Sequence, residues 1–222
     1  MKIKKYWSKV CALAAVLGLS TSLVGAAGGA YIQQGQQTDV NMKLSYPLVY
    51  VSNPQAQQAI NSDIASYVQA AKDAYYNQKV YQVSESYNIK YNGSNYLSII
   101  LTNYYYNYGA AHGSYDQYGL VYDVKTGKRL PLSNFVHIQN EKQLTTGLQS
   151  GLLKMFNGSL SKEVYLNNTW NSVPYISGSY FLTGGGYIYL IYQPYQLGPF
   201  SDGAVKIQLT PQAIDYFNRL NK

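Results

Sequence analysis

The chain has 222 residues and a formal net charge of +7, from 17 basic and 10 acidic side chains. Four basic residues, Lys2, Lys4, Lys5 and Lys9, lie in the first ten positions, so the rest of the chain has 17 − 4 = 13 basic against 10 acidic residues, or +3. That remainder has no lysine- and arginine-rich stripe able to neutralise phosphates, and we expect no nucleic-acid partner. The single cysteine, Cys11, lies in the same N-terminal segment. Disulfides, thiol catalysis and cysteine-ligated metals are therefore excluded from the remainder.

Residues 1–30 have the three parts of a secretory signal peptide. The lysines precede a mostly apolar run, 10–24, and the small residues GAAGGA, and we expect cleavage between Ala26 and Tyr31. The run is short for a spanning helix, which takes about 20 apolar residues. An uncleaved anchor is the alternative, whereas lipid attachment is disfavoured because Cys11 precedes the apolar run. The sequence predicts a protein secreted to, or kept in, the extracytoplasmic envelope of a bacterium, without a stable membrane span after cleavage.

A leader and a strand are expected next. Residues 31–38 (YIQQGQQT) are polar and predict a flexible leader. Residues 39–51 alternate between apolar and polar side chains, which is typical of a strand. The apolar side chains of one face are Val40, Met42, Leu44 and Tyr46. Pro47 lacks a backbone N–H, which favours an edge or bent strand.

A helix of roughly twenty residues should follow, because Ser52-Asn53-Pro54 combines a polar cap with a proline at the first helical position. Apolar side chains then recur at steps of three and four residues. They are Ile60, Ile64, Tyr67, Val68, Ala71 and Tyr75.

Three antiparallel strands are predicted after this helix. Residues 81–91 alternate in polarity, and Asn92-Gly93 favours a tight hairpin turn. The partner strand covers residues 96–106, and a third strand, 115–124, ends at the turn Lys125-Thr126-Gly127-Lys128.

The C-terminal half should contain two helices and short strands. Asn140 is expected to cap a helix over 141–156, and residues 157–179 are polar and irregular. The expected strands are 181–183, 187–193 and 204–209, and Thr210-Pro211 begins a short last helix. Strands and helices are segregated instead of alternating. This predicts an α+β fold, an antiparallel β-sheet with two longer helices and a short C-terminal helix packed on it.

We expect residues 39–222 to form a single domain. Its N-terminal strand-helix-hairpin portion covers about 39–108, and its C-terminal portion about 109–222.

Tyrosine is over-represented, with 26 tyrosines against five phenylalanines. Tyrosine suits half-buried sheet faces, because its ring packs while its hydroxyl keeps a polar partner. A functional alternative is that Tyr104, Tyr106 and Tyr108 form an exposed platform for sugar rings or a partner protein, since aromatic residues are enriched at interfaces.

The chain has few of the residues that catalysis requires. The only histidines are His112 and His137, and no G-x-S-x-G nucleophile elbow occurs. We therefore expect no catalytic triad, no metal site and no cofactor. A carboxylate pair of the kind that hydrolyses glycosides stays an alternative, with Asp116, Asp123 and Asp202 as candidates, although Asp123 is also explained by the following turn.

His112 lies between Gly109 and Gly113 at a strand-to-strand connection. Glycines permit unusual backbone conformations there, and a histidine can hydrogen-bond to the loop backbone and hold the turn. Direct contact with a ligand is the alternative.

The segment GAAHG resembles the GGAHG pattern of the extracellular domain found in RsiV-type anti-sigma factors and PdaC-type peptidoglycan deacetylases. Gly109, Ala111, His112 and Gly113 match the pattern, and Ala110 departs from it. In that family the domain is a cell-envelope domain of unknown function, lysozyme-sensing in the anti-sigma factors.

A second similarity lies at residues 192–203 (YQPYQLGPFSDG), where the family has an aromatic-x-Pro-Tyr-Glu-Ile-Ala-x-Tyr-x-x-Gly stretch. Pro194, Tyr195 and Gly203 match this stretch, and Gln196 replaces the usual glutamate. The resemblance implies an envelope binding or sensing module, with His112 and Tyr195 among its ligand-binding candidates.

We therefore expect a secreted, non-catalytic domain that binds peptidoglycan or another envelope glycan, or a lysozyme-like protein. The alternatives are a carboxylate-dependent hydrolase of wall polysaccharide and a structural part of a surface assembly.

Overall fold

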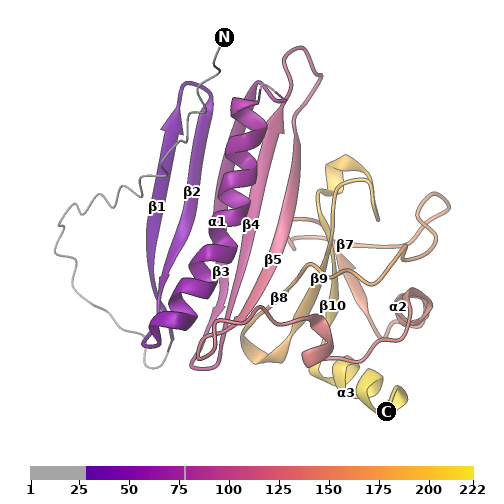
Figure 1. Ribbon diagram of the computed structural model, residues 1–222. Helices are drawn as coiled ribbons and strands as arrows, with labels where there is room; N and C mark the ends of the chain where they lie inside the picture. The colour runs from indigo at the N-terminus through magenta and orange to yellow at the C-terminus, as the bar shows by residue number, and fades with distance from the viewer. Residues whose placement is uncertain (1–28, 78) are drawn as a thin grey trace, which may run out of the picture.

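The computed structural model describes residues 29–77 and 79–222, which form two five-stranded sheets and three α-helices (Figure 1). The first sheet has the order β1-β2-β3-β4-β5 and the second β7-β6-β10-β9-β8. All pairings are antiparallel except that of β2 with β3. The predicted α+β class is confirmed, and the strands divide between two sheets.

The expected flexible leader is instead a strand. β1, Tyr31–Asp39, pairs with β2, Met42–Tyr50, along its whole length. Most of its side chains are exposed, so β1 has no apolar alternation to reveal it, and the ladder to β2 holds it. Gly35 is needed on this strand because the ring of Tyr46 lies where a β-carbon would stand.

Two details of β2 differ from the expectation. Val40 does not join the apolar face, because it lies in the β1–β2 turn and is 89% exposed. β2 is not an edge strand, but it pairs with β3 only from Met42 to Leu44. Pro47 lies beyond that pairing, where β2 has β1 alone as a neighbour and one missing N–H is tolerated.

The predicted helix is confirmed as α1, Pro54–Tyr76. The Asn53 side chain caps it by accepting the backbone N–H groups of Gln55 and Ala56. α1 lies across one face of the first sheet (Figure 1), where its buried residues Ile60 and Ile64 pack with Leu97, Ile99 and Leu101.

The three antiparallel strands are β3, Gln82–Asn92, β4, Tyr96–Tyr106, and β5, Ser114–Asp123. Asp123 accepts the backbone N–H groups of Lys125 and Thr126 at 2.8 Å each, so it stabilises the following turn as expected. β5 belongs to the first sheet, which therefore extends past the division expected near residue 108.

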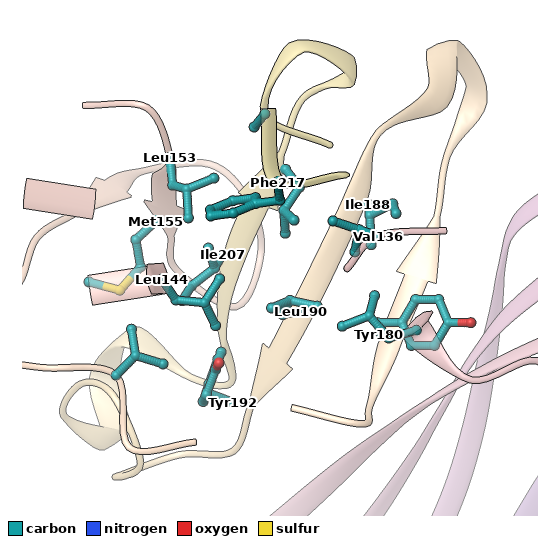
Figure 2. Packing of buried hydrophobic residues seen from close by; sticks show 14 of the residues in the cluster. Val136, Leu144, Leu153, Met155, Tyr180, Ile188, Leu190, Tyr192, Ile207 and Phe217 are labelled. Atoms are coloured by element: carbon teal, nitrogen blue, oxygen red, sulfur yellow. The ribbon is translucent and has the colours of Figure 1, made fainter. Parts of the chain in front are cut away.

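The second half contains shorter elements. They are α2 (Glu141–Gln149), β6 (Lys154–Phe156), β7 (Glu163–Val164), β8 (Tyr180–Leu182), β9 (Ile188–Tyr192), β10 (Val205–Leu209) and α3 (Pro211–Leu220), with single 3-10 turns η1 (Leu132–Asn134), η2 (Gly184–Gly186) and η3 (Phe200–Asp202). Figure 2 shows their common core, in which Leu144, Met155, Leu190, Ile207 and Phe217 come from five different elements.

The helix expected over 141–156 ends early. Asn140 caps it as expected, but α2 stops at Gln149 and Gly151 takes a positive φ of 78°. The Leu153 N–H then donates to the Gly147 carbonyl at 2.9 Å, which reverses the chain. Met155 consequently reaches the core from strand β6.

The outer face of the first sheet, opposite α1, packs against β8 of the second. Ser98 on β4 accepts the Leu182 N–H at 2.9 Å, and Ser179 accepts the Gly119 N–H at 2.8 Å. Gly119 must be a glycine, because a β-carbon there would collide with the backbone of Tyr180.

The signal peptide predicted over residues 1–30 lies outside the described residues apart from its last two. The Ala30 N–H donates to Asn92 Oδ1 at 2.9 Å, and the Ala30 carbonyl accepts from Asn92 Nδ2 at 2.8 Å. Within the described residues, no helix is both long and apolar enough to span a membrane.

Candidate functional site

The candidate residues lie around the loop that joins β4 to β5, and they form two groups. One group gathers around His112, and the other lines a hollow beside Tyr108. The chain from 107 to 113 connects the two groups.

The first group joins the two segments that carry the family resemblance. The exposed His112 ring lies 4.4 Å from the ring of Phe200, centroid to centroid. Phe200, in turn, lies 5.7 Å from Tyr195 and 6.2 Å from Tyr115. Residues 109–113 and 192–203 thus meet in space, and we call His112, Tyr195 and Phe200 the loop cluster.

His112 also interacts with its own turn. Its Nδ1 lies 2.8 Å from the Gly113 carbonyl, which can only accept, so Nδ1 carries the hydrogen in this contact. The side chain therefore has the geometry of the turn-holding role, in a residue that is exposed.

Glycines permit the close packing around this cluster. The ring of Tyr104 covers Gly113 where a β-carbon would stand, and a β-carbon on Gly203 would lie 2.6 Å from the Tyr115 hydroxyl oxygen. Gly203 and Gly109 have positive φ values of 70° and 80°. Ala111 is exposed.

The turn from Gln193 to Gln196 presents Tyr195 to the cluster. The Gln196 N–H donates to the Gln193 carbonyl at 3.0 Å, Pro194 takes the second position, and Tyr195 takes a positive φ of 69°. Gln196 Oε1 accepts the Gln193 N–H at 2.7 Å and the Tyr175 hydroxyl. Position 196 therefore needs a side-chain hydrogen-bond acceptor, which both glutamine and glutamate provide.

The predicted tyrosine platform is divided. Tyr104 and Tyr106 are half-buried, with the Tyr106 hydroxyl donating to the Ala110 carbonyl at 3.2 Å. Tyr108 is 84% exposed and lies 5.4 Å from the ring of Tyr81. Tyr104 therefore lies beside the loop cluster, against Gly113, whereas Tyr108 lines the hollow.

The hollow has a volume of about 610 Å³ and is lined by four tyrosines. We call it the tyrosine hollow, and its lining residues are Asp39, Asn41, Tyr75, Tyr76, Lys79, Val80, Tyr81, Asn107 and Tyr108. They come from the end of β1 and the following turn, the end of α1, the segment before β3 and the β4–β5 loop. Tyr76 and Tyr81 are 56% and 48% exposed, so their rings are available to a ligand.

Hydrogen bonds fix the wall of this hollow. The Tyr76 hydroxyl donates to Asp39 Oδ2 at 3.1 Å, which raises the pKa of Tyr76. The Tyr75 hydroxyl accepts the Asn41 N–H at 3.4 Å. Asp39, Tyr76 and Tyr81 carry no signal in the sequence that marks them as site residues, because no local pattern joins a hairpin turn to a helix end.

The remaining candidates for catalysis are the three aspartates and His137. Asp116 and Asp123 lie seven residues apart on β5, or about 23 Å at strand spacing, which is too far for a glycosidase pair. Asp202 lies in η3, two residues after Phe200 of the loop cluster. The backbone N–H of His137 donates to Asn218 Oδ1 at 2.7 Å. Within the described part of the chain, no three His, Cys, Asp or Glu side chains are placed to hold a metal.

Comparison with known proteins gives structural relatives. No family model and no curated relative matches the chain. It is similar to a solved DUF3298 family member from Bacteroides fragilis, with a TM-score of 0.55, 13% identity, and coverage of 86% of this chain and 94% of that one. It is also similar to a solved DUF3298 family protein from Pseudomonas aeruginosa PAO1. That match has a TM-score of 0.55 and 14% sequence identity, and it covers 84% of this chain and 91% of that one.

The chain has the fold of these DUF3298 proteins. At this identity the similarity establishes the fold alone. Their family name denotes a domain of unknown function.

Proposed function

We propose that this protein is a secreted, non-catalytic binding domain of the bacterial cell envelope and that it holds a wall glycan in the tyrosine hollow. The single observation that carries the proposal is the hollow itself, in which exposed tyrosine rings stand beside Asp39, Asn41 and Asn107. The proposal includes the RsiV/PdaC-type character that the two sequence segments suggest.

The chemistry of the lining suits a sugar. The flat apolar faces of tyrosine rings can cover the C–H face of a pyranose, and the carboxylate and amide groups can pair with its hydroxyls. Asp39 already accepts from Tyr76, so ring and carboxylate are held together before a ligand arrives. Pre-positioning lowers the entropic cost of binding.

The test is calorimetric titration of the protein beginning at Gly29 with soluble peptidoglycan fragments. Tyr81→Ala combined with Tyr108→Ala should weaken binding by about tenfold or more, because each lost ring contact is worth about 1 kcal/mol. Tyr165→Ala, which removes a 71% exposed ring elsewhere, is the matched control and should leave binding unchanged. Equal affinity for the double variant and the native protein would refute the site.

A lysozyme-like protein is the second candidate ligand, and the loop cluster favours it. Tyr195 is 58% exposed and His112 is exposed, and both lie on loops beside Phe200. Exposed aromatic groups of this kind are enriched at protein interfaces. Titration with lysozyme, repeated with Tyr195→Ala, tests this candidate. If the heat of lysozyme binding is unchanged in Tyr195→Ala, the loop cluster is excluded as the binding site.

The same samples test the hydrolase alternative. Peptidoglycan incubated with the protein over a broad pH range should release no soluble product if the domain only binds. Release that follows the protein through purification would contradict the non-catalytic proposal.

A further inference from the structure

A polar cleft lies between the two sheets, on the face of the first sheet opposite α1. It has a volume of about 290 Å³, and none of its lining residues belongs to the tyrosine hollow. Its polar side chains include Ser86, Asn88, Lys90, Thr102, Gln117 and Lys206. The segment 158–160 closes one side, and the Lys206 ammonium holds that segment by donating to the Gly158 carbonyl at 2.8 Å.

The cleft contains two cations and no acid. Lys90 and Lys206 both line it, and its lining includes no aspartate or glutamate. Within the described part of the chain, neither lysine forms an ion pair. Burial, followed by the nearby charge of Lys90, lowers the pKa of Lys206 to about 8, and burial also lowers the pKa of Lys90.

Lys206 supplies a fixed positive charge. It is 1% exposed, and its ammonium donates to Gln117 Oε1 at 2.7 Å and to the Ala204 carbonyl at 2.6 Å, besides Gly158. All three donors therefore serve neutral oxygens, and no carboxylate among residues 29–77 and 79–222 forms an ion pair with the Lys206 ammonium. A buried charge in this state is costly, and an anion in the cleft would offset that cost.

Lys90 can make the direct contact. Its Nζ lies 5.5 Å from the centroid of the Phe181 ring, which forms part of the wall. Ser86 and Asn88 lie on the same strand, β3, and line the cleft together with Lys90, which occupies a β-bulge of that strand. Both are exposed and can donate hydrogen bonds to an oxygen ligand.

We infer that this cleft binds the oxyanion group of a small ligand or polymer unit, a carboxylate or a phosphate. Lys90 pairs with the anion, Ser86 and Asn88 donate to its oxygens, and Lys206 provides the buried charge behind them. The inference does not rest on the proposed glycan site.

The test is an amide NMR titration of the protein with sodium phosphate and, separately, with sodium acetate, each against sodium chloride at equal ionic strength. Saturable shifts are expected at residues 86–90 and 158–160, with a Kd on the order of 1–10 mM. Phosphate and acetate distinguish the two sources of the oxyanion. Raising the chloride concentration should weaken binding, because salt screens the attraction.

Lys90→Met keeps the length of the side chain and removes its charge, and it should weaken binding at least tenfold. Lys43→Met, at an exposed position on β2, is the matched control and should bind as the native protein does. The site is supported if the native protein shows saturable shifts with either anion and Lys90→Met does not. The absence of saturable shifts with both anions, or shifts that survive Lys90→Met, would overturn it.

Discussion

Glu85 should make the stability of this protein decrease as the pH rises. Its side chain is 2% exposed and lies on the helix-facing side of β3, across from Asn103 on β4. Among the described residues, neither Glu85 carboxylate oxygen nor Asn103 Oδ1 has a hydrogen-bond partner. Burial raises the pKa of Glu85 from 4.5 to about 7. A proton on the carboxyl group can be donated to Asn103 Oδ1 and satisfy both groups.

The direction and size of the effect follow from this pKa. Between pH 4.5 and about 7 the folded protein keeps a proton that the unfolded chain has released. The free energy of unfolding therefore falls with rising pH in that window. The stabilisation that comes from the raised pKa of Glu85 is fully present below pH 4.5 and lost above about pH 7. A pKa difference of 7 − 4.5 = 2.5 corresponds to about 3 kcal/mol.

The assay is urea unfolding followed by fluorescence, with native protein and Glu85→Gln compared between about pH 4.5 and pH 8. The glutamine amide is neutral at every pH and can donate to Asn103. The variant should therefore gain about 3 kcal/mol on the native protein across the window. Asp116, Tyr105 and Tyr118 lie on the same side of the sheet and are present in both proteins, so the comparison isolates the change at Glu85.

Asp73→Asn, which changes an exposed acid on α1, is the control. Its free energy of unfolding should vary with pH as that of the native protein does. Parallel curves for the native protein and Glu85→Gln would refute the reasoning, because they would show that Glu85 titrates alike in the folded and unfolded chains.

Three further changes test the packing and the caps. Phe217→Ala should lower the free energy of unfolding in urea by about 3–5 kcal/mol, because the ring is 1% exposed in the core of the second half. Tyr216→Ala, at the exposed neighbouring position, is the control. A decrease for Phe217→Ala under about 1 kcal/mol, no larger than that of the control, would contradict this packing. Gly119→Ala should lower stability by about 2 kcal/mol or more, since the new β-carbon meets the Tyr180 backbone, and an unchanged urea midpoint would argue against the close approach of the sheets. Asn53→Ala should cost about 1 kcal/mol through loss of the α1 cap, and unchanged stability would count against the capping bonds.

The sequence by itself determined the elements that depend on local signals. Asn53 with Pro54, and Thr210 with Pro211, mark the starts of α1 and α3, because a polar cap and a proline act within one helical turn. Asp123 likewise stabilises its turn with bonds to residues two and three positions later. The period of buried residues along α1 was also a local property of the chain.

Only the tertiary structure decided the features that depend on distant partners. β1 has an exposed surface and is a strand because β2 pairs with it, and Met155 reaches the second core from strand β6 instead of from a longer α2. The loop cluster and the tyrosine hollow both combine segments far apart in the chain. Lys206 alternates with apolar residues along β10 and looks like an ordinary surface charge, whereas Glu85 interrupts the apolar face of β3. They are buried because a helix and a second sheet cover them. Burial is the largest cause of their shifted pKa values, and the charge of Lys90 adds to the shift at Lys206.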